Sequence, residues 1–458
     1  MVLANNIEGR GRQLLLPYAI YGAFAFLAMV LEKNDFFVAA GCVLLVAASV
    51  MGLYFYKKDQ SLVSFRFLLS VFWTAGEGLG VMQLSNLQSS WTNQTWLSFG
   101  GFYLLFLAGY EAIEIYLSKR VIVLESKCQM SKKEVTKEQF QNRLFCCIRI
   151  VSLVTFATFV LEAVILGYVP LFSTETHAYD HFHISGVHYF TVSCMFTHSL
   201  TLIYMLTYTE KKKDRQPLEK GKLIQLIVYN ALSASIPILS VSKFQFVLTL
   251  ALPILIFLLM RPNVNKKKLL GAAAAVIIAA AVFMTIRRNY EPGYLNSIFQ
   301  MKNENMPLFL QYAYMYIANN YSNFNCLTQA LQQGLVEHTF GLKQLFPVFA
   351  LTGLKFVFPA LVAFEMPVTI KELNTLTLIY DAYYDFGLIG VFLFGLILGA
   401  VCAALTQKIR KSSNPILYLF YAQLALYLAL SFFSSWFTVP TTWFWFALTG
   451  ALYLYVKK

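Results

Sequence analysis

The sequence predicts an all-α membrane protein with about twelve transmembrane helices. Of its 458 residues, 58% are hydrophobic and only 13% are charged, which is too few to cover a soluble core with a polar surface. Apolar stretches also recur at the length of about 20 residues that a spanning helix needs. The net charge of +13 would suit a nucleic-acid binder, but Lys and Arg occupy short loops between apolar stretches. We therefore interpret the charge as a topology signal and expect no nucleic acid as a partner.

Each apolar stretch is expected to cross the roughly 30 Å hydrocarbon layer as a helix. Lys and Arg accumulate in every second connection, from Arg10 and Arg12 to Lys457 and Lys458, so the positive-inside rule predicts that both termini are cytoplasmic. The expected spans are Leu14–Leu31, Phe36–Tyr56, Leu62–Leu84, Trp96–Leu117, Leu144–Val169, Val187–Tyr208, Leu223–Val241, Phe244–Met260, Leu269–Ile286, Phe386–Leu405, Ile416–Phe433 and Trp443–Val456.

One external connection is far longer than a compact bundle needs, and it divides the chain. We expect an N-terminal transmembrane bundle of about nine spans at 1–286, a large external loop at 287–384 and three C-terminal spans at 385–458. Within the loop, Phe346–Phe364 is apolar but contains Lys355 between two prolines. Counting it as a span would place the basic loop after the tenth span on the external side of the membrane, against the positive-inside rule. This stretch is therefore expected to form short interfacial or re-entrant helices.

Several ionisable residues fall inside or at the ends of the predicted spans, where charge must be solvated, paired or functional. Arg66, Glu111 and Glu114 lie near cytoplasmic ends, and we expect them to reach water there. Glu77 and Glu162 lie toward the external halves. Either could line a polar cavity, and either could be a satisfied structural carboxylate.

Three cations fall at external span ends, where the positive-inside bias makes cations uncommon. Lys243, Arg287 and Arg288 suggest an anionic ligand, and a lipid diphosphate in the outer leaflet fits an Arg fork with an added Lys charge. The alternative is simple anchoring at lipid headgroups.

Candidate bases lie in and just after the external loop. His338 could take a proton from a hydroxyl nucleophile, because imidazole is a common general base in proteins. Asp385 begins the tenth predicted span, where it could cap that helix or act as a carboxylate base, and Asp381 one turn earlier is its rival. Loop tyrosines such as Tyr290 could stack on sugars or sit at the membrane interface. Histidines near His181 lack a fixed third ligand, so we predict no metal site.

Short motifs in this region resemble the Wzy-type oligosaccharide repeat-unit polymerases of bacterial surface polysaccharide assembly. The resemblance covers roughly residues 167–405. Where the family often has Arg, this chain has Lys243, which leaves a single-charge contact in place of a bidentate fork. The matching motifs are Gly167-Tyr168-Val169-Pro170-Leu171-Phe172, Leu239-Ser240-Val241-Ser242-Lys243, and Asn374-Thr375-Leu376-Thr377 running into Tyr384-Asp385-Phe386-Gly387 and Gly390.

The resemblance implies a glycosyltransferase of the bacterial cytoplasmic membrane, similar in architecture to other membrane-embedded lipid-linked sugar transferases. A growing glycan on undecaprenyl diphosphate would be transferred, at the outer face and without a cofactor, onto the non-reducing end of a second lipid-linked repeat unit. A chain-length regulator and a flippase are candidate partners. The expected roles are diphosphate binding for Arg287, Arg288 and Lys243, proton transfer for Asp385, His338 or Asp381, and glycan contact for Tyr384, Asn374 and Tyr290.

Two other functions stay open. An O-antigen ligase-like transferase would share the span count and the long external loop but pass the polymer to a different acceptor. A secondary transporter or glycolipid flippase would also suit twelve spans with cytoplasmic ends. Against it, the sequence shows no internal repeat, and the loop at Lys57-Lys58-Asp59-Gln60 lacks the Gly-Asp-Arg pattern of the major facilitator transporters. No Gly-rich phosphate loop is present, which argues against an ATP-driven machine.

Overall fold

The computed structural model describes residues 2–124, 137–173, 178–209, 218–261, 271, 293–412 and 414–457. These residues form helices and loops, and the one pairing of extended backbone among them is an isolated bridge between Ser85 and Met301. The chain divides into two compact units, both assembled from separate stretches of sequence. Unit 1 contains Met1–Lys127, Tyr290–Lys408 and Tyr427–Pro440, and unit 2 contains Cys128–Asn289, Ile409–Leu426 and Thr441–Lys458.

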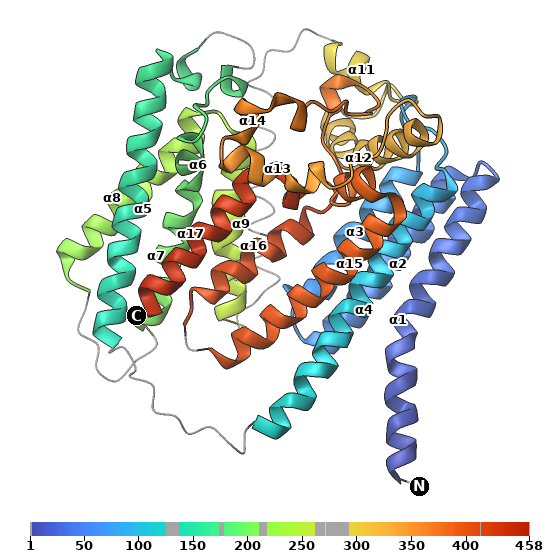
Figure 1. The fold of residues 1–458 in the computed structure, drawn as a ribbon, viewed down its shortest axis with the longest axis horizontal. Helices are drawn as coiled ribbons and strands as arrows, with labels where there is room; N and C mark the ends of the chain where they lie inside the picture. Colours follow the sequence, from blue (N-terminus) through green and yellow to red (C-terminus); the bar gives the residue numbers. More distant parts are fainter. Residues whose placement is uncertain are drawn as a thin grey trace. The chain divides into compact units, whose positions relative to one another are not determined.

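Unit 1 is built on three neighbouring helices, α2, α3 and α4 (Figure 1). Helix α3 begins after Ser64, whose hydroxyl accepts a hydrogen bond from the backbone N–H of Phe67 (3.3 Å). The elements of this unit are α1 (Val2–Lys33), α2 (Phe37–Asp59), α3 (Phe65–Val81), α4 (Asn93–Leu124), α11 (Tyr294–Phe299), α12 (Leu308–Gln332), α13 (Leu342–Leu351), α14 (Leu354–Val357), η4 (Pro359–Leu361), η5 (Lys371–Leu373), most of α15 (Tyr380–Lys411) and η6 (Trp436–Thr438).

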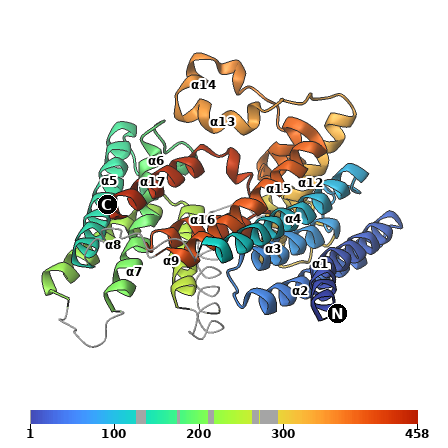
Figure 2. The same ribbon diagram turned by 60° about the horizontal axis from the view of Figure 1, so that its bottom comes forward.

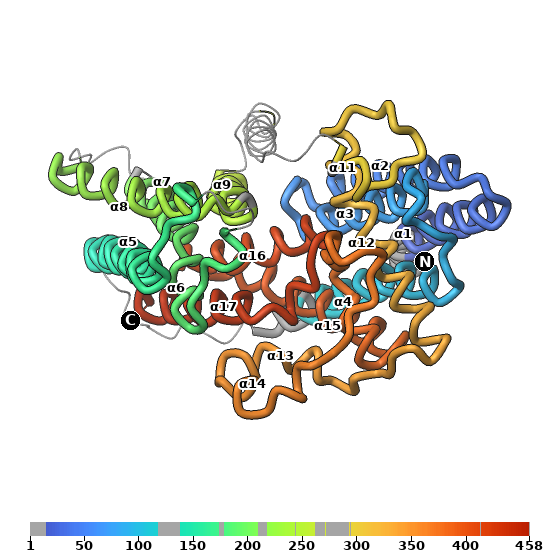
Figure 3. Tube along the Cα trace, turned by 90° about the horizontal axis from the view of Figure 1, so that it is seen from above, coloured from blue at the N-terminus to red at the C-terminus, as the bar shows by residue number. Residues whose placement is uncertain are grey.

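Unit 2 is a second helical cluster in which α5, α7, α8 and α9 are neighbours. Figure 3 follows their backbone from above. Helix α16 (Leu417–Ala429) begins in this unit and ends in unit 1. The other elements of unit 2 are α5 (Lys137–Leu166), η1 (Pro170–Phe172), η2 (Ala178–Asp180), α6 (His188–Thr191), η3 (Val192–Cys194), α7 (Met195–Thr209), α8 (Lys220–Leu239), α9 (Lys243–Met260) and α17 (Pro440–Lys457).

Seven helical stretches in the described part of the chain are long and apolar enough to cross a membrane, so the chain is an all-helical, polytopic membrane protein. All seven coincide with predicted spans. The predicted third span is the 17-residue helix α3, the eighth and eleventh are the shorter apolar helices α9 and α16, the twelfth lies in α17, which is not among the seven, and the ninth lies almost wholly outside the described residues. The seven are Leu15–Lys33, Phe37–Asp59, Asn93–Leu117, Glu138–Leu166, His188–Tyr208, Lys220–Leu239 and Tyr380–Lys411.

The apolar stretch at 346–364 is not one continuous helix. It is divided among α13, α14 and η4, with Gly353 in the left-handed region (φ +78°) between the first two. Figure 2 shows α13 and α14 next to each other. A ten-residue helix such as α13 rises only about 15 Å, half the thickness of the hydrocarbon layer.

Candidate functional site

The candidate site lies at a break in α15, within unit 1. Phe386 (φ −138°, ψ 18°) and Gly387 (φ 58°, ψ −143°) leave the helical conformation, although helix continues on both sides. The backbone of Gly387 occupies a region that other residues enter only with strain, because a Cβ atom would collide with the neighbouring peptide groups. At the break, the carbonyl groups of the preceding helical turn lose the N–H donors that a continuous helix would supply. These carbonyl groups must therefore accept hydrogen bonds from elsewhere.

A loop segment supplies those partners. The backbone N–H of Thr339 donates to the carbonyl of Tyr384 (3.2 Å), and that of Phe340 donates to the carbonyl of Asp385 (3.3 Å). The Nδ1 of His338 lies 3.0 Å from the same Tyr384 oxygen. The motif around His338 and the motif around Asp385, 46 residues apart, therefore meet at the break.

Asp385 is fully buried, and its carboxylate holds the first turn of α13. Its oxygens accept hydrogen bonds from the backbone N–H groups of Lys343 (3.1 Å) and Gln344 (2.8 Å) and from the Thr339 hydroxyl (2.5 Å). Sequence reasoning offered Asp385 as a cap of its own helix, which is wrong, because α15 begins earlier, at Tyr380. The carboxylate instead caps a different helix, where the helix dipole also favours negative charge.

His338 has a defined tautomer. A carbonyl oxygen can only accept, so the contact with Tyr384 places the ring proton on Nδ1 and leaves the lone pair on Nε2. The ring is half-buried and faces Gly387, where a Cβ atom would lie 3.7 Å from Nε2. Of the three predicted bases, Asp385 has hydrogen-bond donors assigned to both of its carboxylate oxygens, whereas no donor is assigned to Nε2 of His338 or to Oδ1 of Asp381 among the described residues.

Asp381, one turn before Asp385, is a satisfied structural carboxylate. It is buried, and its Oδ2 accepts hydrogen bonds from the hydroxyls of Ser435 (2.5 Å) and Thr438 (2.6 Å). These bonds tie the start of α15 to the segment around η6. The geometry suits positioning better than proton transfer.

A cation that sequence reasoning missed lies beside the break. The Nζ of Lys343 is 5.1 Å from the ring centre of Tyr384 and 5.2 Å from that of Phe364. The Tyr384 side chain is buried and its hydroxyl donates to the Glu365 carbonyl (3.0 Å), so it holds the loop in addition to any contact with a glycan. Lys343 lies five residues after His338, and this closeness in sequence is the signal that could have identified it.

The other predicted ligand-binding residues are not assembled at the break. Arg287, Arg288 and Tyr290 lie outside the described residues. Lys243 is the first residue of α9, in unit 2, and its side chain is likewise outside the described part. Asn374 is exposed and directly follows η5.

A row of buried asparagines on α12 orders the segment that leads into α15. Asn323 donates to the carbonyls of Leu373 (2.7 Å) and Thr375 (2.9 Å) and accepts from the N–H of Thr369 (2.9 Å). Asn320 donates to the carbonyl of Phe432 (2.6 Å). Sequence reasoning missed this row, although the polar run at 319–325 within an otherwise apolar helix is a recognisable signal.

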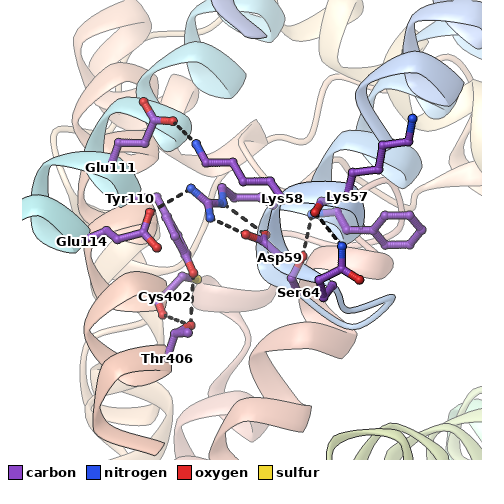
Figure 4. A network of polar contacts seen from close by, with 12 residues as sticks. Lys57, Lys58, Asp59, Ser64, Tyr110, Glu111, Glu114, Cys402 and Thr406 are labelled. Carbon is purple, nitrogen blue, oxygen red and sulfur yellow. Dashed lines mark hydrogen bonds and ion pairs between the residues drawn. The ribbon is translucent and has the colours of Figure 1, made fainter. Parts of the chain in front are cut away.

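A second polar centre of unit 1 surrounds Arg66 (Figure 4). Arg66 and Glu111 were expected to reach water, and this expectation is wrong. Arg66 is 2% exposed, hydrogen-bonds both oxygens of Asp59 and donates to Glu114 (2.9 Å). Glu111 is also buried and accepts from Lys58 (3.1 Å). The side chain of Glu114 keeps 30% exposure. Arg66 and Glu111 are therefore paired with opposite charges inside the protein. Asp59 and Lys58 supply these charges from the end of α2, and Glu114 supplies a further one from α4.

The two acidic residues expected toward the external halves of spans, Glu77 and Glu162, are buried too. Glu162 accepts from the N–H of Ile184 (3.0 Å) and contacts His188 Nδ1 (3.1 Å), so it is a satisfied structural carboxylate. Glu77 is buried against Tyr21. Among the residues that the structure describes, no three His, Cys, Asp or Glu side chains are grouped so that they could hold a metal ion.

Comparisons with protein-family models, with curated proteins and with solved structures found no match for this chain.

Proposed function

We propose that the protein is a polymerase of lipid-linked oligosaccharide repeat units. It would transfer a growing glycan from undecaprenyl diphosphate onto the non-reducing end of another undecaprenyl-diphosphate-linked repeat unit. The reaction would take place at the outer face of the bacterial cytoplasmic membrane, in a protein with twelve spans, cytoplasmic termini and an external loop at 287–384. One observation supports this most directly: His338 of that loop meets the Tyr384-Asp385-Phe386-Gly387 motif at the break in α15.

In this reaction His338 acts as the general base. The acceptor hydroxyl attacks the anomeric carbon of the donor sugar, and its proton passes to Nε2 of His338. The bond between that carbon and the diphosphate oxygen breaks, and undecaprenyl diphosphate leaves. Asp385 and Gly387 are positioning residues, since they hold the loop and the broken helix that present His338. The expected diphosphate ligands are Arg287, Arg288 and Lys243, and Lys343 supplies a positive charge beside the break in α15.

The test is the length of the surface glycan. In cells that carry His338→Ala, single repeat units should stay on the lipid carrier and long chains should disappear from a gel of the glycan. Arg288→Ala should do the same if it binds the diphosphate. Glu337→Gln, at the exposed neighbouring position, is the matched control and should keep full-length chains. Chains of normal length from His338→Ala at normal protein level would overturn the assignment.

A secondary transporter or glycolipid flippase is the second candidate, and the break in α15 favours it. Discontinuous spanning helices with polar groups at the break line the binding sites of many transporters. Reconstituted vesicles separate the two functions. Movement of a solute or a lipid-linked glycan across the bilayer, without any extension of glycans by the purified protein, would support transport.

A further inference from the structure

Glu77 occupies a deeply buried position in unit 1. It lies in the C-terminal half of α3 and is 1% exposed. The hydroxyl of Tyr21, on α1, lies 3.1 Å from Oε1 and 3.0 Å from Oε2 and donates its one proton between them.

Other buried carboxylates of the same unit have stronger partners. Glu111 has a lysine and the Tyr18 hydroxyl, Asp381 has two hydroxyls, and Asp385 has two backbone N–H groups and a hydroxyl. In the described ranges no Lys, Arg or His forms an ion pair with Glu77. Its neighbours are neutral aromatic side chains: Tyr21 from α1, Trp73 from α3, Tyr103 from α4 and Tyr321 from α12.

The backbone beside Glu77 leaves little room for a counter-ion. A Cβ atom on Gly76 would lie 2.3 Å from the Tyr321 hydroxyl, so α3 presses against α12 on that side. A Cβ atom on Gly78 would lie 2.9 Å from the carbonyl of Gly41, so α3 presses against α2 on the other. A glycine on each side of the acidic residue is what allows both contacts.

We propose that Glu77 is a proton-binding site. An ionised carboxylate that is removed from water and has no cation, with only the neutral donors Tyr21 and Trp73 beside it, is strongly disfavoured, whereas the neutral acid fits among aromatic rings. The ligand is one proton from solvent, and its binding converts the carboxylate to the carboxylic acid. The site does not depend on the reaction proposed above.

Release of the proton should loosen the packing around Glu77. The carboxylate would keep the Tyr21 hydroxyl as a donor but would also need water or a cation, which the tight α2–α3 and α3–α12 packing does not admit. The direction of the pH dependence follows from the form of Glu77 that the packed arrangement contains, which is the protonated one. The packed arrangement is stabilised at pH values where Glu77 holds its proton, and this stabilisation is lost as the pH rises.

Infrared spectroscopy of the purified full-length protein tests the proposal. Spectra of the native protein recorded at increasing pH should contain the carbonyl band of a protonated carboxylic acid that fades as the pH rises. Glu77→Gln should lack this band. Glu111→Gln, which removes a buried glutamate paired with a lysine, is the matched control and should retain it. Identical spectra for the native protein and Glu77→Gln would overturn the proposal.

A second variant keeps the proposal testable if Glu77→Gln fails to fold. Tyr21→Phe removes the hydroxyl donor and leaves the acid in place. Its carbonyl band should move to higher frequency, and the pH at which the band fades should rise, because the ionised form has lost its hydrogen bond. An unmoved band in Tyr21→Phe would show that the band does not come from Glu77.

Discussion

The Arg66 network and the break in α15 both bury carboxylates in unit 1, but they satisfy them with different partners. Around Arg66, the carboxylates of Asp59, Glu111 and Glu114 face a guanidinium and an ammonium (Figure 4). At the break, Asp381 and Asp385 accept hydrogen bonds from hydroxyls and backbone N–H groups. Charge is paired with charge in the first region and with neutral donors in the second.

The difference predicts which region controls stability. Removing one partner of a buried ion pair leaves the other charge unpaired in a poorly solvated place, which is strongly destabilising. Removing one of several neutral donors leaves the carboxylate with the others, and the loss is that of one hydrogen bond. Substitutions around Arg66 should therefore change folding, whereas substitutions at the break should change function with a smaller effect on folding.

Arg66→Ala should have the largest effect. It leaves Asp59 without its cation, and we expect a loss of about 3–5 kcal/mol in the free energy of unfolding. Equilibrium unfolding in mixed micelles measures it. Arg149→Ala, at an exposed position, is the control and should stay within about 0.5 kcal/mol of the native protein. Equal losses in the two variants would contradict the comparison.

Gly387→Ala should come next. A Cβ atom there would have 3.5 Å of space to His338, so the cost is that of backbone strain, about 1–3 kcal/mol. The same unfolding experiment applies, and glycan chain length should fall with it because the loop no longer fits the break. Gly450→Ala, which adds an ordinary 3.9 Å contact, is the control. A native-like Gly387→Ala protein would show that the break needs no glycine.

Asp385→Ala should lower stability by about 0.5–2 kcal/mol, the usual range for loss of a helix cap. Asp385→Asn keeps an acceptor oxygen and should lose less. Hydrogen exchange gives a local readout, because the amides of Lys343 and Gln344 should exchange faster in the Ala variant. If their exchange does not change, Asp385 does not cap α13 in solution.

Lys343→Met should have the smallest effect on folding. It keeps most of the aliphatic chain against Tyr384 and Phe364 and loses a cation–π contact of about 0.5–1 kcal/mol. Lys371→Met, at an exposed lysine, is the control for stability and for glycan length. Shortened chains in Lys343→Met alone would identify Lys343 as part of the diphosphate site, and unchanged chains would remove it from that site.

The apolar spanning helices could be predicted from the sequence because length and hydropathy decide them without reference to partners. The break in α15 could not, because Gly387 in a spanning stretch is equally compatible with a straight helix. For Asp385 a cap of its own helix was one of two roles left open, and the carboxylate instead caps α13, since it can accept from any helix N-terminus that the fold brings to it. Arg66 was misjudged for a similar reason: its partner Glu114 lies 48 residues away in sequence.

The interleaving of the two units bears on the order in which the chain can fold during synthesis. Unit 1 needs the stretch Tyr427–Pro440, which carries the hydroxyls that bind Asp381, and unit 2 needs Thr441–Lys458. Neither unit can close while these stretches are still in the ribosome. Helices made earlier then carry unpaired polar groups, among them Asn320 of α12, whose partner is the carbonyl of Phe432, and such intermediates are exposed to mispairing and proteolysis.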